Sequence, residues 1–354
     1  MERIKFDPKE LEPVGYTSGS SYSPPMPVFG YPITRKENFE LMLKGETPLW
    51  LPQSSEIYLF MPECVPDNWA RGLVSATRPV DREKDFGGID MFGVEWEYVP
   101  AVNGSMVRPG KPFVADLDHW EDYVQIPDFD AWDWEGCYEA SKEKLTEGRM
   151  IKVSVLSGLF ERLISFIDMT DAMVSLVDED AQPAVHRLFD KLCEVYDKLF
   201  EKFETYFHPD FVWFHDDWGS QRAPFFSANT VREMIAPYLK RIVDSAHKHG
   251  MYFELHSCGQ VESLVPVMIE CGVDLWNGQD MNDKVKMAQM YGDKIIVDSH
   301  PEYLSADATE EEAAANIQKY LDKFAGLRTY ANRMGGHPKD NELIYALSRQ
   351  MLNP

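Results

Sequence analysis

The chain alternates between short apolar runs and longer stretches in which apolar residues recur every third or fourth position. The short runs predict strands and the periodic stretches predict core-facing helices. The clearest helix spans residues 183–207, where Leu188, Leu192 and Leu199 share one face. The expected strands, in chain order, are residues 151–156, 211–214, 251–255, 273–276, 295–298 and 327–330, with residues 95–99 as a further candidate. Strands separated by helices indicate successive βα units and a parallel sheet.

Capping signals support several of the helices between these strands. Thr230 with Glu233, and Thr309 with Glu312, have the spacing of a capping box. The first of these helices is expected to end at Gly250, because a glycine just past the last turn adopts the left-handed conformation without a steric cost.

This alternation is compatible with a doubly wound sheet or with a barrel. A doubly wound sheet usually carries a glycine-rich phosphate turn, and neither G-x-G-x-x-G nor G-x-x-x-x-G-K-[ST] occurs in the sequence. We therefore predict an α/β fold with a (β/α)8 TIM barrel over residues 91–354. Residues 1–90, rich in proline and aromatic side chains, are expected to form an N-terminal extension packed on the barrel, with one helix near residues 38–43.

The net charge of the chain limits the kinds of molecule that it is expected to bind. The 354 residues include 35 Lys and Arg against 59 Asp and Glu, which gives a formal net charge of −24. Such an excess of negative charge repels phosphate backbones and anionic membrane surfaces, so we expect neither nucleic-acid binding nor membrane association. Because no apolar run approaches the roughly 20 residues that span a bilayer, a cytoplasmic protein is expected. The five cysteines are an odd number and widely spread, which argues against a disulfide framework.

Polar side chains follow the expected strands at the ends that face the mouth of a barrel, where active sites form. Each such residue also has a plain structural interpretation, such as capping the next helix or bonding a nearby loop. Their convergence on one mouth is the informative feature, because several titratable groups repel one another unless a ligand or metal organises them. The residues are His215, Asp216, Asp217, His256, Cys258, Asn277, Gln279, Asp298, His300, Asn332, Arg333 and His337.

His256 and Cys258 have the most specific spacing of this set. Two residues apart just beyond a strand, an imidazole and a thiolate can turn toward one centre, and this mixed nitrogen and sulfur pair suits Zn²⁺. The alternative is that the backbone satisfies His256 and that Cys258 is a small buried apolar residue.

Three segments resemble the uroporphyrinogen decarboxylase superfamily. They are Phe-His-Asp-Asp-Trp-Gly at residues 214–219, Leu-His-Ser-Cys-Gly at residues 255–259, and Asp-Met-Phe-Gly-Val-Glu-Trp at residues 90–96. The resemblance runs from about residue 35 to the C-terminal end of the sequence and implies a (β/α)8 barrel. It also implies one of two activities, decarboxylation of uroporphyrinogen or zinc-dependent methyl transfer with a corrinoid.

The methyltransferase branch, which includes methylcobalamin:coenzyme M methyltransferase-like and O-demethylase-like proteins, fits better. Gln53 and Ile57 stand where the decarboxylases carry arginines for the porphyrinogen carboxylates. The methyltransferases bind zinc through a His-x-Cys pair and a late cysteine, and His256 and Cys258 match the pair. No cysteine follows Cys271, so we predict His337 as the third ligand.

The resemblance therefore implies methyl transfer between a methoxylated or similar small-molecule donor and the cobalt of a corrinoid, either free cobalamin or bound to a partner protein. Zinc is the expected metal, with His300 as the alternative third ligand, and a homodimer is compatible with the sequence. Decarboxylation of uroporphyrinogen or a related acid, and noncatalytic binding of a corrinoid or metal, are the alternatives. The expected catalytic residues are Asp216, Asp217, His215 and Glu95, with Asp216 favoured over Asp217 for the cavity, and the expected substrate-binding residues are Trp96, Trp218, Asn277, Gln279, His300 and Arg333.

Overall fold

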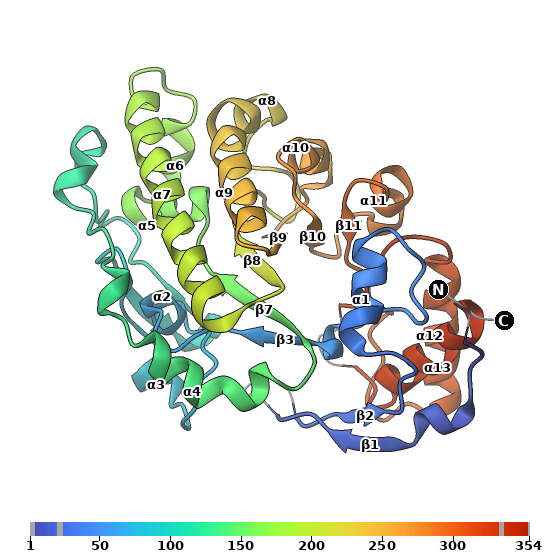
Figure 1. Cartoon of the computed structure of the whole chain (residues 1–354). Coiled ribbons are helices and arrows are strands. Elements are labelled where there is room, and N and C mark those ends of the chain that lie inside the picture. Colours follow the sequence, from blue (N-terminus) through green and yellow to red (C-terminus); the bar gives the residue numbers. More distant parts are fainter. Residues whose placement is uncertain (1–3, 20–23, 333–335, 353–354) are drawn as a thin grey trace. The chain divides into compact units, whose positions relative to one another are not determined.

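A computed structural model describes residues 4–19, 24–332 and 336–352 (Figure 1). The chain forms two compact units that each combine separate stretches of sequence. Among the described residues, no helix combines the length and the apolar character that crossing a bilayer requires. The first unit comprises residues 1–58, 143–150 and 283–354, and the second comprises residues 59–142 and 151–282.

A parallel sheet is the centre of the second unit. Its strands pair in chain order, β7 with β8, β8 with β9 and β9 with β10. Figure 1 shows helices α7 and α9 running beside each other along this sheet. The strands are β7 (Met150–Val155), β8 (Phe211–His215), β9 (Tyr252–Ser257) and β10 (Leu275–Gly278). The helices between them are α5 (Leu159–Ile167), α6 (Met169–Ser175), α7 (Gln182–Phe207), α8 (Ala228–Thr230), α9 (Ala236–Lys248) and α10 (Val265–Glu270).

The two faces of this sheet differ in chemistry because successive side chains of a strand point to opposite sides. Val212 and Phe214 of β8 are fully buried on the face that the helices cover, and Leu255 of β9 pairs in register with Phe214. The opposite face carries Trp213 and His215 of β8 together with Glu254 and His256 of β9. The register of the sheet therefore gathers polar side chains on one face.

Helix α7 confirms the prediction for residues 183–207. Its apolar row is buried, and Leu188, Leu192 and Leu199 are each at most 1% exposed. The cap predicted at Thr230 is wrong. Helix α8 begins one turn earlier, because the Ser227 side chain accepts the Thr230 backbone N–H, and a short π-helical turn over Val231–Ile235 joins it to α9.

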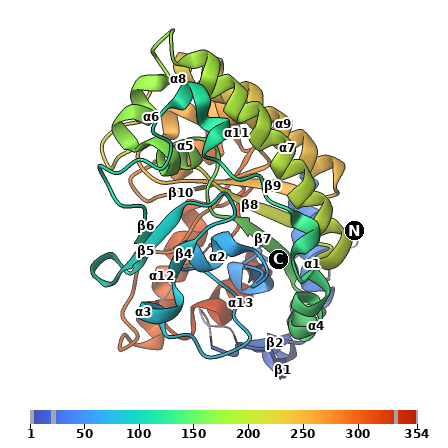
Figure 2. The ribbon, with the colours of Figure 1, turned by 90° about the vertical axis from the view of Figure 1, so that its left-hand side faces the viewer.

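The strand predicted at residues 95–99 is present, but it belongs to a separate antiparallel sheet. Strand β5 (Glu95–Val99) pairs with β4 (Gly87–Ile89) on one side and with β6 (Gly104–Met106) on the other. The links are too short for a parallel crossover, and Asp90 closes the first turn by accepting the backbone N–H groups of Phe92 and Val94. Figure 2 shows this sheet with α2 (Pro66–Ala70) beside it.

The first unit carries most of the remaining helices and strands. The capping box predicted at Thr309 and Glu312 is confirmed, with each side chain accepting the other residue's backbone N–H. The helices are α1 (Arg35–Leu43), α11 (Lys284–Tyr291), α12 (Glu310–Lys323) and α13 (Asp340–Leu352). The strands are β1 (Pro13–Tyr16), β2 (Pro27–Phe29) and β11 (Ile296–Val297). Two elements, β3 (Ile57–Phe60) and α4 (Trp134–Leu145), each have residues in both units. Helix α3 (Arg82–Asp85) belongs to the second unit.

Residues 327–330 do not form the predicted strand. The isolated parallel bridges lie at the next residue, Ala331, which pairs with Gln53 and with Ser299. Individual backbone hydrogen bonds hold the end of this stretch, such as the one that the Ala331 N–H donates to the Pro52 carbonyl. They do not continue into a ladder. The division at residue 90 between an extension and a barrel stays a prediction.

A buried carboxyl group in the first unit predicts a pH-dependent stability. Glu56 is 1% exposed and accepts the Trp50 indole N–H at 2.7 Å. Burial raises its pKa from 4.5 to about 8, against the smaller opposing effects of the Trp50 bond and the Arg35 charge. Because the folded protein holds this proton more tightly, the wild type loses stability as the pH rises from about 4.5 to about 8.

Glu56→Gln keeps an acceptor for Trp50 and removes the titration. We expect the free energy of unfolding of this variant, relative to that of the wild type, to increase as the pH rises through this window. Urea unfolding at pH 5, 7 and 9 measures the difference. Glu311→Gln on the exposed side of α12 is the control for the loss of one glutamate carboxylate at the surface. A Glu56→Gln difference that is the same at all three pH values would contradict this interpretation.

Candidate metal centre

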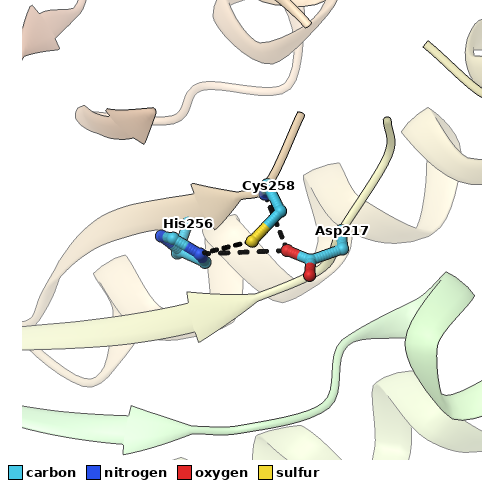
Figure 3. A group of neighbouring side chains, drawn as sticks. All are labelled: Asp217, His256 and Cys258. Atoms are coloured by element: carbon cyan, nitrogen blue, oxygen red, sulfur yellow. Dashed lines mark hydrogen bonds and ion pairs between the residues drawn. The ribbon is translucent and has the colours of Figure 1, made fainter. Parts of the chain in front are cut away.

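Asp217, His256 and Cys258 bring three potential metal ligands together where β8 and β9 end (Figure 3). The His256 Nε2 atom lies 3.4 Å from Cys258 Sγ and 3.8 Å from Asp217 Oδ1. The Cys258 backbone N–H donates to the same Asp217 oxygen at 2.7 Å. One ligand atom from each residue lies within 4.8 Å of the other two, so a single ion between them could contact all three.

The sequence builds this arrangement through strand register and a tight turn. In the parallel sheet His215 pairs with His256, so the residues that follow each strand emerge at the same edge. Gly259 has a φ of +93°, and a Cβ atom there would meet the backbone of Gly219 at 2.3 Å. Glycine at both positions lets the two loops touch, which keeps Cys258 near Asp217.

A hydrogen bond from the neighbouring strand orients the His256 ring. Its Nδ1 atom lies 2.6 Å from Oδ1 of Asn277 on β10. Because that amide oxygen only accepts, Nδ1 carries the proton and Nε2 keeps its lone pair toward Cys258 and Asp217. In this tautomer the Nε2 lone pair is the one that could bind a metal.

We expect Asn277→Ala to weaken zinc binding by about 10- to 100-fold, because the His256 ring would lose the group that fixes its tautomer and orientation. Competition with a chromophoric chelator measures the affinity. Asn277→Asp, which keeps an acceptor, should retain most of it. Equal affinity in the Asn277→Ala variant and the wild type would show that the ring needs no such partner.

The two adjacent carboxylates after β8 occupy different environments. Asp216 is fully buried, and its oxygens accept the Glu161 backbone N–H at 2.9 Å and the Trp218 indole N–H at 2.8 Å. Burial raises the pKa of Asp216 to about 7, and these two bonds only partly oppose it. The contacts with His256 and Cys258 belong to Asp217, while the preference for Asp216 as the carboxylate of the cavity stays a prediction.

Comparison with known proteins places the fold. No family model matches the chain, and no curated protein is significantly similar to it in sequence. Among solved structures, the chain resembles a methyltransferase from Methanosarcina mazei with a TM-score of 0.60 and 16% identity, over 91% of this chain and 100% of that one. The two proteins share a fold.

Other solved structures match less of the chain. A sugar phosphate isomerase/epimerase from Parabacteroides distasonis has a TM-score of 0.33 and 11% identity, over 60% of this chain and 78% of that one. Xylanase B from Clostridium stercorarium has a TM-score of 0.36 and 11% identity, over 58% of this chain and 73% of that one. With the parallel sheet described above, the M. mazei likeness confirms the predicted TIM-barrel-like α/β class, although closure into a complete barrel is not seen among the described strand pairings.

Two charged residues near the candidate metal centre were not predicted from the sequence. Glu161, in the first turn of α5, forms an ion pair with Arg71 at 3.2 Å, and Arg71 also donates to Ser157 Oγ at 3.1 Å. Burial raises the pKa of Glu161, the Arg71 charge opposes this, and the nearby carboxylate of Asp217 adds to it. A search extended from the strand end to the first turn of the next helix would have found Glu161, whereas no local signal marks Arg71.

The predicted substrate-binding residues of the second unit have varied surroundings. The Trp96 ring lies under the Arg71 guanidinium, 4.7 Å from ring centroid to Cζ, and its N–H donates to Asp90. Trp218 is fully buried against Asp216, and Gln279 accepts the Gly259 backbone N–H at 2.8 Å. The predicted catalytic residue Glu95 is exposed on β5. Their functional roles stay predictions.

The other predicted residues belong to the first unit. His337 is buried; its Nδ1 accepts the Lys339 backbone N–H at 3.2 Å and its own backbone N–H donates to Asp340. The His300 Nδ1 atom lies 2.9 Å from the Pro301 carbonyl oxygen. Arg333 lies outside the described residues. The ligand roles of His337 and His300 stay predictions.

The donor set and its charges fit a divalent zinc ion. Imidazole nitrogen, thiolate sulfur and carboxylate oxygen are the three ligand types that Zn²⁺ takes in proteins. Burial, followed by the carboxylate of Asp217, raises the pKa of the Cys258 thiol, so the thiol keeps its proton without a cation, and a bound Zn²⁺ would favour the thiolate. Three protein ligands would leave a fourth position open, as in catalytic zinc sites.

Proposed function

We propose that this protein is a zinc-dependent methyltransferase of the corrinoid branch of the uroporphyrinogen decarboxylase superfamily. It would move a methyl group between a methoxylated or similar small molecule and the cobalt of a corrinoid, either free or carried by a partner protein. The observation that carries the proposal is the cluster of Asp217, His256 and Cys258 at the carboxyl ends of β8 and β9. The fold shared with the M. mazei methyltransferase supports it.

In this proposal Asp217, His256 and Cys258 hold the zinc ion. When bound, zinc supplies a Lewis acid that stabilises negative charge on the heteroatom from which the methyl group departs, or to which it is added. Asn277 keeps His256 in its binding tautomer, and the touching turns at Gly219 and Gly259 keep Cys258 in place.

Transfer of a methyl group from an ether to cobalt also needs a proton, because the departing alkoxide or phenoxide must end as an alcohol or phenol. Asp216 is suited to hold that proton, since its pKa of about 7 allows both protonation states near neutral pH. Glu161, whose pKa burial also raises, is the second acid near the centre, and Arg71 orients it.

The proposal is tested by mixing zinc-loaded protein with cob(I)alamin and a panel of methoxyarenes, methylamines and methyl thiols. Methylcobalamin absorbance is expected to rise with at least one donor and to stay flat with Cys258→Ser. Cys271→Ser is the matched control, because Cys271 is buried beyond α10 and contacts the Ala236 carbonyl. Conversion of uroporphyrinogen to coproporphyrinogen, with no methyl transfer, would instead support a decarboxylase.

A further inference from the structure

The sheet face that carries His256 continues below the metal centre as a second layer of side chains. In register across three strands, Ser154 of β7 lies beside Trp213 of β8, which lies beside Glu254 of β9. The layer above it holds His215 and His256. Neighbouring strands are about 4.8 Å apart, so these side chains lie within contact distance of one another.

Three polar atoms of these layers are buried without a hydrogen-bond partner among the described residues. They are Ser154 Oγ, Trp213 Nε1 and His215 Nε2. The Trp213 and His215 rings lie 3.9 Å apart between centroids, and His215 lies 4.7 Å from the His256 ring. An unpartnered buried polar atom lowers stability, so three in neighbouring positions indicate a ligand that completes their hydrogen bonds.

The chemistry of these atoms limits the ligand. The Trp213 indole N–H only donates, and the Ser154 hydroxyl donates or accepts. An ammonium group, the form that alkylamines take near neutral pH, has no lone pair to accept the indole N–H, and thioether sulfur is a weak acceptor. The charges of two cationic side chains, Arg71 and Lys152, reach His215, and each of these side chains already pairs with a carboxylate, Arg71 with Glu161 and Lys152 with Glu254. A neutral oxygen acceptor fits best.

We propose that Ser154, Trp213 and His215 form a specificity subsite that binds a neutral phenolic or alcoholic oxygen of the methyl donor. This inference rests on the proposed function and deepens it, because it selects hydroxylated methoxy compounds over methylamines and methyl thiols. The Trp213 and His215 residues are each partly exposed, although the three polar atoms themselves are buried.

Trp276 provides an internal comparison. Its indole N–H is also buried and without a hydrogen-bond partner among the described residues. In register, however, it pairs with Leu255 and lies on the helix-covered face of the sheet, where its ring packs over Gly278. It stands apart from the cluster and from the metal centre, so the same substitution there tests the general effect of losing an indole N–H.

The test is a calorimetric titration of zinc-loaded protein with guaiacol and with anisole, which differ by one hydroxyl group. We expect the wild type and Trp276→Phe to bind guaiacol about tenfold more tightly than anisole. This ratio corresponds to the free energy of one good hydrogen bond. In Trp213→Phe the ratio should fall to about one, with anisole affinity little changed. Ser154→Ala should lower the ratio as well, and it carries the test if thermal melting shows that Trp213→Phe does not fold.

A guaiacol-to-anisole ratio in the Trp213→Phe variant equal to that of the wild type would overturn the subsite, as would the absence of guaiacol binding to the wild type. The titration contains no corrinoid, so its outcome is independent of methyl transfer. The wild type could prefer guaiacol to anisole, and lose this preference in Trp213→Phe, while no methylcobalamin forms in the panel assay. That result would refute the proposed function and would still support the subsite.

Discussion

Replacement of Cys258 by serine is expected to remove most of the zinc that the wild type retains after dialysis against a weak chelator. The wild type should hold about one zinc per chain, because three protein ligands suffice for a catalytic site. Thiolate is the strongest ligand of the set, and His256→Ala should have a similar effect because its Nε2 atom is aimed at Cys258 Sγ. Elemental analysis by mass spectrometry measures the metal content.

The same measurement identifies the third ligand. Loss of zinc in Asp217→Asn would favour the cluster seen at the ends of β8 and β9, whereas loss in His337→Ala would favour the ligand predicted from the sequence. His300→Ala tests the remaining alternative. Cys271→Ser should keep its zinc, and full retention in both Cys258→Ser and His256→Ala would contradict the metal centre as a whole.

Replacement of Arg162 by alanine is expected to cost about 3–5 kcal/mol of the free energy of unfolding. The Arg162 guanidinium is fully buried and forms ion pairs with Asp67 of α2 and with Asp90. Its removal leaves two buried carboxylates facing each other without a counter-charge. Asp90 also accepts the Trp96 indole N–H, so the same network fixes Trp96 beneath Arg71.

Urea unfolding measures this loss, and the transition slope shows whether the variant still unfolds as one unit. Arg232→Ala is the control, because Arg232 forms its ion pair with Glu270 at the surface, where solvent screens the charges. Its effect should be much smaller. A loss in Arg162→Ala no larger than in Arg232→Ala would mean that the buried carboxylates find protons or other partners without Arg162.

The sequence alone determined the architecture where signals are local. The apolar row of α7 and the capping box at Thr309 are confirmed, because periodicity and capping depend on residues a few positions apart. The βα alternation, and with it the TIM-barrel-like class, follows from the same short-range patterns. The predictions failed where pairing partners decided the outcome, as for β5, which joins an antiparallel sheet, and for residues 327–330, which form no strand and are followed by isolated bridges at Ala331.

The candidate site divides in the same way. Strand ends marked His256 and Cys258 in the sequence, because residues that follow a parallel strand emerge at one edge of the sheet. Only the tertiary structure showed that Asp217, rather than Asp216, contacts His256 and Cys258. The path of the chain after β8 sets where each carboxylate points, and this path cannot be read from the sequence. The tertiary structure alone brought Arg71 to Glu161 across 90 residues of sequence, because a contact between distant segments depends on packing and leaves no pattern in the sequence near either residue.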